Sequence, residues 1–136
     1  MTLLQVHIVS ASAWLGLIAA ETVIELMARD RAARQFVAKA HKTIDLYFEG
    51  PLVAIMLVTG SLLLTRLWPN ASVLLLVKVA VGLVAVVSNL LCIHWVLGRA
   101  RARDDDEFRA YAQKISLTGY TIPLGILALA IGLYGV

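Results

Sequence analysis

The sequence predicts an all-α integral membrane protein: a four-helix bundle with both chain termini on the non-cytoplasmic side. Of its 136 residues, 60% are hydrophobic and only 15% are charged, whereas soluble domains average about 45–50% and about 25%. Four stretches reach the roughly 20 mostly apolar residues that a membrane-spanning helix needs. Helices are favoured in lipid because they satisfy their own backbone hydrogen bonds. The composition argues against a soluble enzyme and against a disordered chain.

The four predicted spans form a single domain and use most of the chain. They are expected at about residues 3–27, 44–65, 73–97 and 115–136. The first has no basic residues ahead of its apolar run and carries His7, Glu21 and Glu25. It is therefore interpreted as a retained helix and not as a signal peptide. The short linker between the second and third spans contains Trp68, a residue common at the membrane interface.

The basic residues predict how the bundle is oriented. Of the twelve Lys and Arg residues, ten lie in the first and third linkers. They are Arg29, Arg31, Arg34, Lys39, Lys42, Arg99, Arg101, Arg103, Arg109 and Lys114. The positive-inside rule places both linkers in the cytoplasm, in a protein of the inner (plasma) membrane. The net charge of +3 thus indicates topology, and nucleic acid is not expected as a partner. The acidic run at 104–107 is interpreted as a solvated loop.

Two basic side chains are expected inside the spans near the outer surface. His7 and Lys78 each lie about 6–9 Å deep at roughly 1.5 Å per residue, and they can face each other across the bundle. One interpretation is structural, with Lys78 reaching back to the interface. The other is a pair of nitrogen ligands, since histidine is a common axial ligand of haem iron. Trp14 follows His7 by seven residues, on nearly the same helical face.

A second polar group is expected near the cytoplasmic surface. Glu21 and Glu25 end the first span, and His41, Asp45 and Glu49 follow at i, i+4 and i+8 where the second begins. His94 lies towards the end of the third span. Ionisable groups inside a membrane are costly and are functional candidates by default. Three interpretations stay open here: structural ion pairs, proton handling, or a metal site within the bundle.

Several short motifs resemble two related groups of small membrane proteins. These motifs are His7-x6-Trp14-Leu15-Gly16, Pro51 with Gly60, Lys78 within Leu-Val-Lys-Val-Ala, and the run from His94 to Arg99. The two groups are the oxygen-independent protoporphyrinogen oxidases of haem synthesis and the four-helix domain of copper-resistance protein D. The resemblance implies that His7 and Lys78 bind haem b, with Trp14 beside them. The acidic set is not a feature of those oxidases.

Three functions follow as expectations. The first is a haem-b-binding redox protein, whose enzymatic form would be an oxidase that passes electrons from a tetrapyrrole to a quinone or another membrane acceptor. The second is metal-ion transport or tolerance, with a divalent ion held by the carboxylates, His41 and His94. The third is a non-catalytic subunit of a complex or a homo-oligomer in the lipid bilayer. Its contact face would be the small-residue stripe of Gly125, Ala128 and Gly132.

Overall fold

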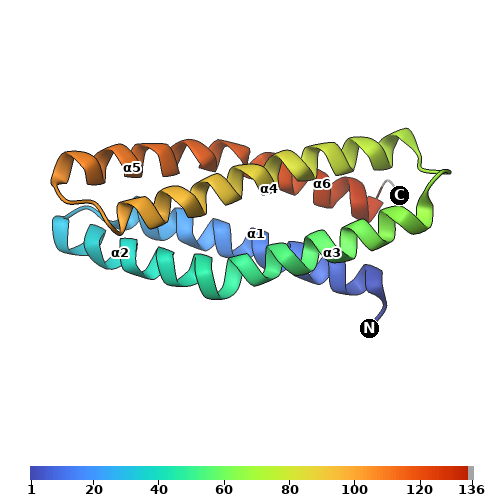
Figure 1. Ribbon diagram of the computed structural model, residues 1–136, viewed down its shortest axis with the longest axis horizontal. Coiled ribbons are helices and arrows are strands. Elements are labelled where there is room, and N and C mark those ends of the chain that lie inside the picture. Colours follow the sequence, from blue (N-terminus) through green and yellow to red (C-terminus); the bar gives the residue numbers. More distant parts are fainter. Residues whose placement is uncertain (135–136) are drawn as a thin grey trace.

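The computed structural model describes residues 1–134, and that part of the chain forms four long helical rods (Figure 1). Each rod is long and apolar enough to cross a membrane, which confirms the predicted all-helical architecture. The first is α1 (Leu3–Met27) and the third is α4 (Val73–Arg99). The second joins α2 (Arg31–Ile44), a π-helical turn η1 (Asp45–Glu49) and α3 (Gly50–Leu67). The fourth joins α5 (Asp105–Thr118), a 3-10 turn η2 (Gly119–Thr121) and α6 (Ile122–Tyr134). The predicted end of the last span at Val136 lies outside the described residues.

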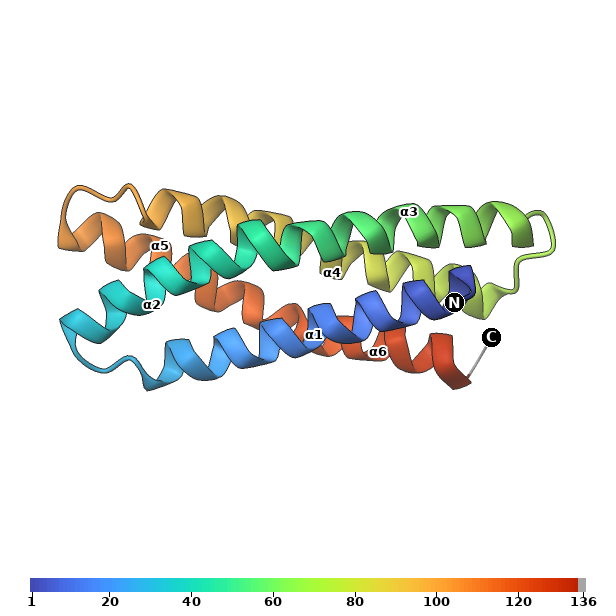
Figure 2. The ribbon, with the colours of Figure 1, turned by 90° about the horizontal axis from the view of Figure 1, so that it is seen from below.

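The rods are antiparallel, as short connections require. The α1–α2 and α4–α5 connections lie at one end of the bundle, and the α3–α4 connection lies at the other end with the N-terminus (Figures 1 and 2). α4 packs against α5 and α6, and α1 packs against α3 and α6. The basic linkers therefore gather at the end of the bundle opposite the N-terminus.

Two helices begin much earlier than the apolar spans predict. α2 begins at Arg31 and α5 at Asp105, so most of both basic linkers is helical. Each start is capped, because the Asp30 carboxylate accepts from the Ala33 amide at 2.7 Å and the Asp104 carboxylate accepts from the Glu107 amide at 2.8 Å. Acidic side chains are favourable at a helix N-terminus. The expectation of a loop at 104–107 is therefore wrong, although these side chains are exposed.

Several polar side chains are buried inside the bundle, while many large apolar ones face outwards. The apolar core holds Trp14, Val53, Met56, Ala85 and Val86. However, two of the three largest side chains that are less than 2% exposed are acids, Glu49 and Asp45. Exposed leucines, valines and isoleucines occur on every rod. This distribution fits contact with a lipid bilayer.

The small-residue stripe on α6 is used within the bundle. An added Cβ at Gly125 would lie 2.8 Å from Leu15 Cδ2, and one at Gly132 would lie 2.8 Å from Lys78 Cε. Ala128 Cβ lies 3.7 Å from the position of a Cβ at Gly82. Small residues let helices approach closely in membranes. The stripe thus packs α6 against α1 and α4, and it is not the open contact face expected for a partner.

Candidate metal centre

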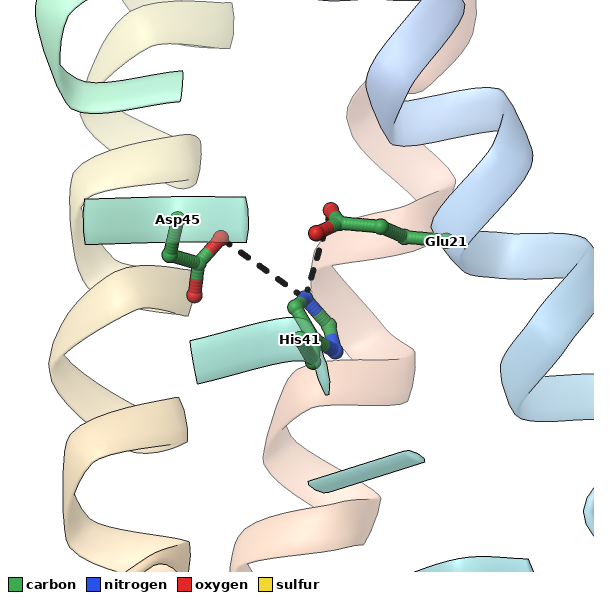
Figure 3. A group of neighbouring side chains, drawn as sticks. All are labelled: Glu21, His41 and Asp45. Atoms are coloured by element: carbon green, nitrogen blue, oxygen red, sulfur yellow. Dashed lines mark ion pairs between the residues drawn. The ribbon is translucent and has the colours of Figure 1, made fainter. Parts of the chain in front are cut away.

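Three of the four rods place polar side chains at one point in the bundle interior. α1 contributes Glu21 and Glu25, and α4 contributes Asn89 and Arg99. The second rod contributes the other three, which are His41, Asp45 and Glu49. Glu25 is partly exposed and the other six are buried. Figure 3 shows Glu21, His41 and Asp45 pointing towards one another from α1, α2 and η1.

The π-helical turn keeps three of these residues on one face. In a regular α-helix, a residue eight positions after His41 would be rotated by about 80°. The turn from Asp45 to Glu49 takes one more residue, because the N–H of Gly50 donates to the Asp45 carbonyl, and this rotates Glu49 back. Pro51 follows directly, and its missing N–H is a common cause of such irregularity. Both acids consequently point inwards.

The imidazole of His41 lies between three carboxylates. Its Nδ1 is 2.7 Å from Glu25 Oε1. Its Nε2 is 3.4 Å from Glu21 Oε2 and 3.8 Å from Asp45 Oδ1 (Figure 3). One ligand atom from each of Glu21, His41 and Asp45 lies within 4.8 Å of the others. Two tetrahedral zinc ligands at about 2.1 Å from the metal are about 3.4 Å apart, so the His41–Glu21 separation already suits an ion.

Glu25 and Arg99 fix the orientation of the His41 ring. Arg99 Nη2 donates to Glu25 Oε1 at 2.6 Å and lies 3.3 Å from His41 Nδ1. Because the same oxygen accepts from His41, we assign the proton to Nδ1. The Nε2 lone pair is then directed at Glu21 and Asp45. Metal-binding histidines typically donate their other N–H to a carboxylate in this way.

Several carboxylate oxygens at this centre have no amide, hydroxyl or basic hydrogen-bond donor among the described residues. Asn89 Nδ2 donates to Glu49 Oε2 at 2.7 Å. Within the described chain, no amide, hydroxyl or basic group donates to either oxygen of Asp45, Glu21 Oε1, Glu49 Oε1 or Asn89 Oδ1. Glu49 lies within hydrogen-bonding reach of both Glu21 and Asp45, so a proton shared between these acids is one way to satisfy them. Asp45 is only 1% exposed and Glu49 is fully buried. Buried polar atoms are normally satisfied, and leaving them unpaired is costly.

The formal charges at the centre are also unbalanced. Glu21, Glu25, Asp45 and Glu49 are four acids, and Arg99 is the permanent cation in contact with them. His41 adds at most one further positive charge. Burying an unpaired charged side chain costs on the order of several kcal/mol, even after the protein relaxes. A bound cation or bound protons must therefore offset the excess.

A cavity of about 140 Å³ adjoins the centre, between α1 and the rods of α4 and α5–α6, and it is partly open to the outside. Its polar end includes Glu21, Glu25, His41 and Asn89. Most of the remaining wall is apolar and includes Trp14, whose buried indole N–H finds no acceptor in the part of the chain that the structure describes. Asp45 and Glu49 are not part of this wall.

The other predicted residues lie elsewhere. His7 Nδ1 is 3.0 Å from Thr59 Oγ1 and 3.1 Å from the Met56 carbonyl, both on α3. Lys78 lies against Gly132 of α6. Both side chains are half-buried; they contact different helices but are near enough for the charge of Lys78 to act on the His7 ring. His94 is exposed on α4, outside the centre.

Arg99 is a member of the centre that its position beside the third linker does not predict, because that position indicates a topology-setting surface charge. Its signal was present, because Asn89, Cys92, Val96 and Arg99 recur at spacings of three and four, and all are buried on one face of α4. Such spacing indicates an inward-facing stripe. Arg99 is thus the last residue of the interior face of α4.

No known protein family, curated protein or solved structure matches this chain. The resemblance to the haem-synthesis oxidases and the copper-resistance group therefore stays a prediction. Chemistry has to be inferred from the contacts within the chain. Those contacts converge on His41 and the acids around it.

Proposed function

We propose that this protein binds a divalent metal ion inside the membrane, in metal-ion transport or tolerance. The ion would be held by Glu21, His41 Nε2 and Asp45. The observation that supports this most is the set of ligand atoms within 4.8 Å of one another, in which neither Asp45 oxygen accepts from any group of residues 1–134. A divalent cation would supply the missing partner and offset two negative charges.

Neighbouring residues would tune the centre. Glu25, held by Arg99, accepts from His41 Nδ1 and so orients Nε2 towards the ion. Glu49, held by Asn89, lies next in the acidic group and offers a further oxygen. Carboxylates suit Mn²⁺ and Mg²⁺, and an imidazole suits zinc, iron and nickel. One imidazole with several carboxylates therefore favours ions such as Zn²⁺, Fe²⁺ and Mn²⁺.

We infer that the chain lies in the cell's inner membrane, with both termini on the non-cytoplasmic side. The basic connections gather at one end of the bundle, and the positive-inside rule assigns that end to the cytoplasm. The metal centre would then lie nearer the cytoplasmic surface than the outer one. A membrane-impermeant thiol reagent added outside sealed cells should label a cysteine placed at position 2 and should not label one placed at position 102.

A titration of purified protein with Zn²⁺ and Mn²⁺ in nonionic detergent tests the proposal. Asp45→Asn keeps the shape of the side chain but removes its charge, and we expect at least about a hundredfold loss of affinity, since altering even an outer partner costs about 10–100-fold. Asp106→Asn is the matched control, because Asp106 is exposed in the first turn of α5. Zn²⁺ uptake into proteoliposomes then separates transport from storage.

Haem b binding at His7 is a second candidate function, and the contact between His7 and Thr59 favours it. Thr59 Oγ1 donates its proton to the Ile55 carbonyl at 2.7 Å, so it accepts from His7 Nδ1, as the Met56 carbonyl does. This leaves His7 Nε2 free as a ligand. Lys78 is turned towards α6, so the contacts favour His7 alone. Purified protein should then show a Soret band that His7→Ala removes, and colourless protein from haem-replete cells would contradict it.

A further inference from the structure

The cavity beside the metal centre has the dimensions of a small organic ligand. Its volume of about 140 Å³ is close to that of a cavity that holds one benzene molecule, about 150 Å³. It is too small for a tetrapyrrole and much larger than one ion needs. Its opening towards the outside of the bundle gives a ligand a way in.

The cavity has an apolar body and an acidic end. Leu15, Ile18 and Ala85 are among the apolar residues of the wall, together with the ring of Trp14. At the other end, Glu21 and Asn89 line the wall, and each carries a buried oxygen without a partner in the described chain, which a ligand reaches once the side chain turns into the cavity. Glu21 is only 5% exposed and Asn89 only 7%. The vacant groups at this end are thus acceptors, and one of them belongs to an acid, whereas the vacant donor of the wall is the indole N–H of Trp14.

We propose that this cavity binds a small lipophilic organic amine in its protonated form. The ammonium group would donate to Glu21 and Asn89, and an apolar body of about one ring would fill the space beside Trp14. An ammonium group carries three donors and no acceptor, which matches the vacant oxygens. A neutral apolar ligand would leave those oxygens unpaired, and an anion would be repelled by the acids.

This site is separable from the proposed metal centre, although the two share Glu21. Asp45 is needed for the metal and is not part of the cavity wall. Gly119 is part of the wall and contributes nothing to the metal centre. A Cβ added at Gly119 meets no atom of the described residues within 4 Å, so the wall has room for a larger side chain at this position.

Calorimetric titration with benzylammonium chloride in nonionic detergent tests this proposal, with benzyl alcohol as the uncharged analogue of similar size. We expect the ammonium to bind and the alcohol to bind at least about tenfold more weakly. Glu21→Gln should weaken amine binding by about 30-fold or more, because it removes a buried charge partner. Asp45→Asn should retain amine binding while it loses Zn²⁺ binding.

Gly119→Leu should fill the cavity and abolish amine binding without loss of Zn²⁺ binding, which also shows that the variant is folded. Gly16→Leu is the matched control, because Gly16 is exposed on α1 and an added Cβ there also meets nothing within 4 Å. It should bind the amine like the unaltered protein. Equal affinity for the alcohol and the ammonium, or unchanged amine binding in Gly119→Leu, would overturn the proposal.

Discussion

Replacing Arg99 by methionine should strongly destabilise the bundle. The side chain is only 2% exposed, and its Nη2 donates to Glu25 Oε1 at 2.6 Å. It also lies over the Phe108 ring, 5.7 Å from the centroid. Arg99→Met would keep most of the side-chain volume but would leave Glu25 without its cation in a site that already has excess acid.

The size of this effect follows from burial. Removing one partner of a buried ion pair costs about 3–5 kcal/mol. Because the Glu25 side chain is 28% exposed, solvent screens part of the loss, and we take the lower end, about 3 kcal/mol. Arg31→Met is the control: Arg31 pairs with Asp105 at 3.1 Å, but the two side chains are 76% and 60% exposed. That change should cost at most about 1 kcal/mol.

Unfolding in mixed micelles of increasing SDS fraction, followed by far-UV circular dichroism, measures both variants. The double variant Glu25→Gln/Arg99→Met should lose less stability than the sum of the two single changes, because neither charge is left alone. If Arg99→Met were no less stable than Arg31→Met, Arg99 would not hold the centre together.

Two further predictions concern the helical extensions. An added Cβ at Gly98 would collide with the Tyr111 ring of α5, so Gly98→Val should destabilise the protein by about 1–3 kcal/mol in the same SDS titration. The control Gly16→Val should change the free energy of unfolding by no more than about 1 kcal/mol. An equal loss of stability in both variants would contradict the packing of α5 on α4. Asp104→Ala should lower the free energy of unfolding by about 1 kcal/mol through loss of the N-terminal cap of α5. Amide hydrogen exchange in the first turn of α5 should become faster than in the unaltered protein. An unchanged exchange rate there would show that α5 does not depend on this cap.

The sequence predicts the number of rods well because lipid-facing helices are long, continuous apolar stretches that hydropathy detects. It does not predict where α2 and α5 begin, because hydropathy detects the apolar part of a helix and not its polar extension. The signals for those starts are the capping residues Asp30 and Asp104. The carboxylate of each accepts a hydrogen bond from the backbone amide three residues later. Capping spacing was therefore the missing information.

The candidate centre is partly predictable for a similar reason. The spacing of His41 and Asp45 predicts a shared face, and the π-helical turn, which the spacing does not predict, adds Glu49 to it, so that all three are buried together. Which rods meet cannot be read from one helix, so the pairing of His41 with Glu25 and Arg99 required the packed structure. The same limit applies to His7, whose partners Met56 and Thr59 lie in a separate span.

X-ray absorption at the zinc edge of Zn²⁺-loaded protein tests the central claim most directly. We expect one imidazole nitrogen from His41 and oxygen ligands from Glu21 and Asp45, all at about 2.0–2.2 Å from the zinc. His41→Ala should lose the imidazole signal. A sulfur neighbour at about 2.3 Å, an imidazole signal that persists in His41→Ala, or protein that retains no zinc would contradict the account.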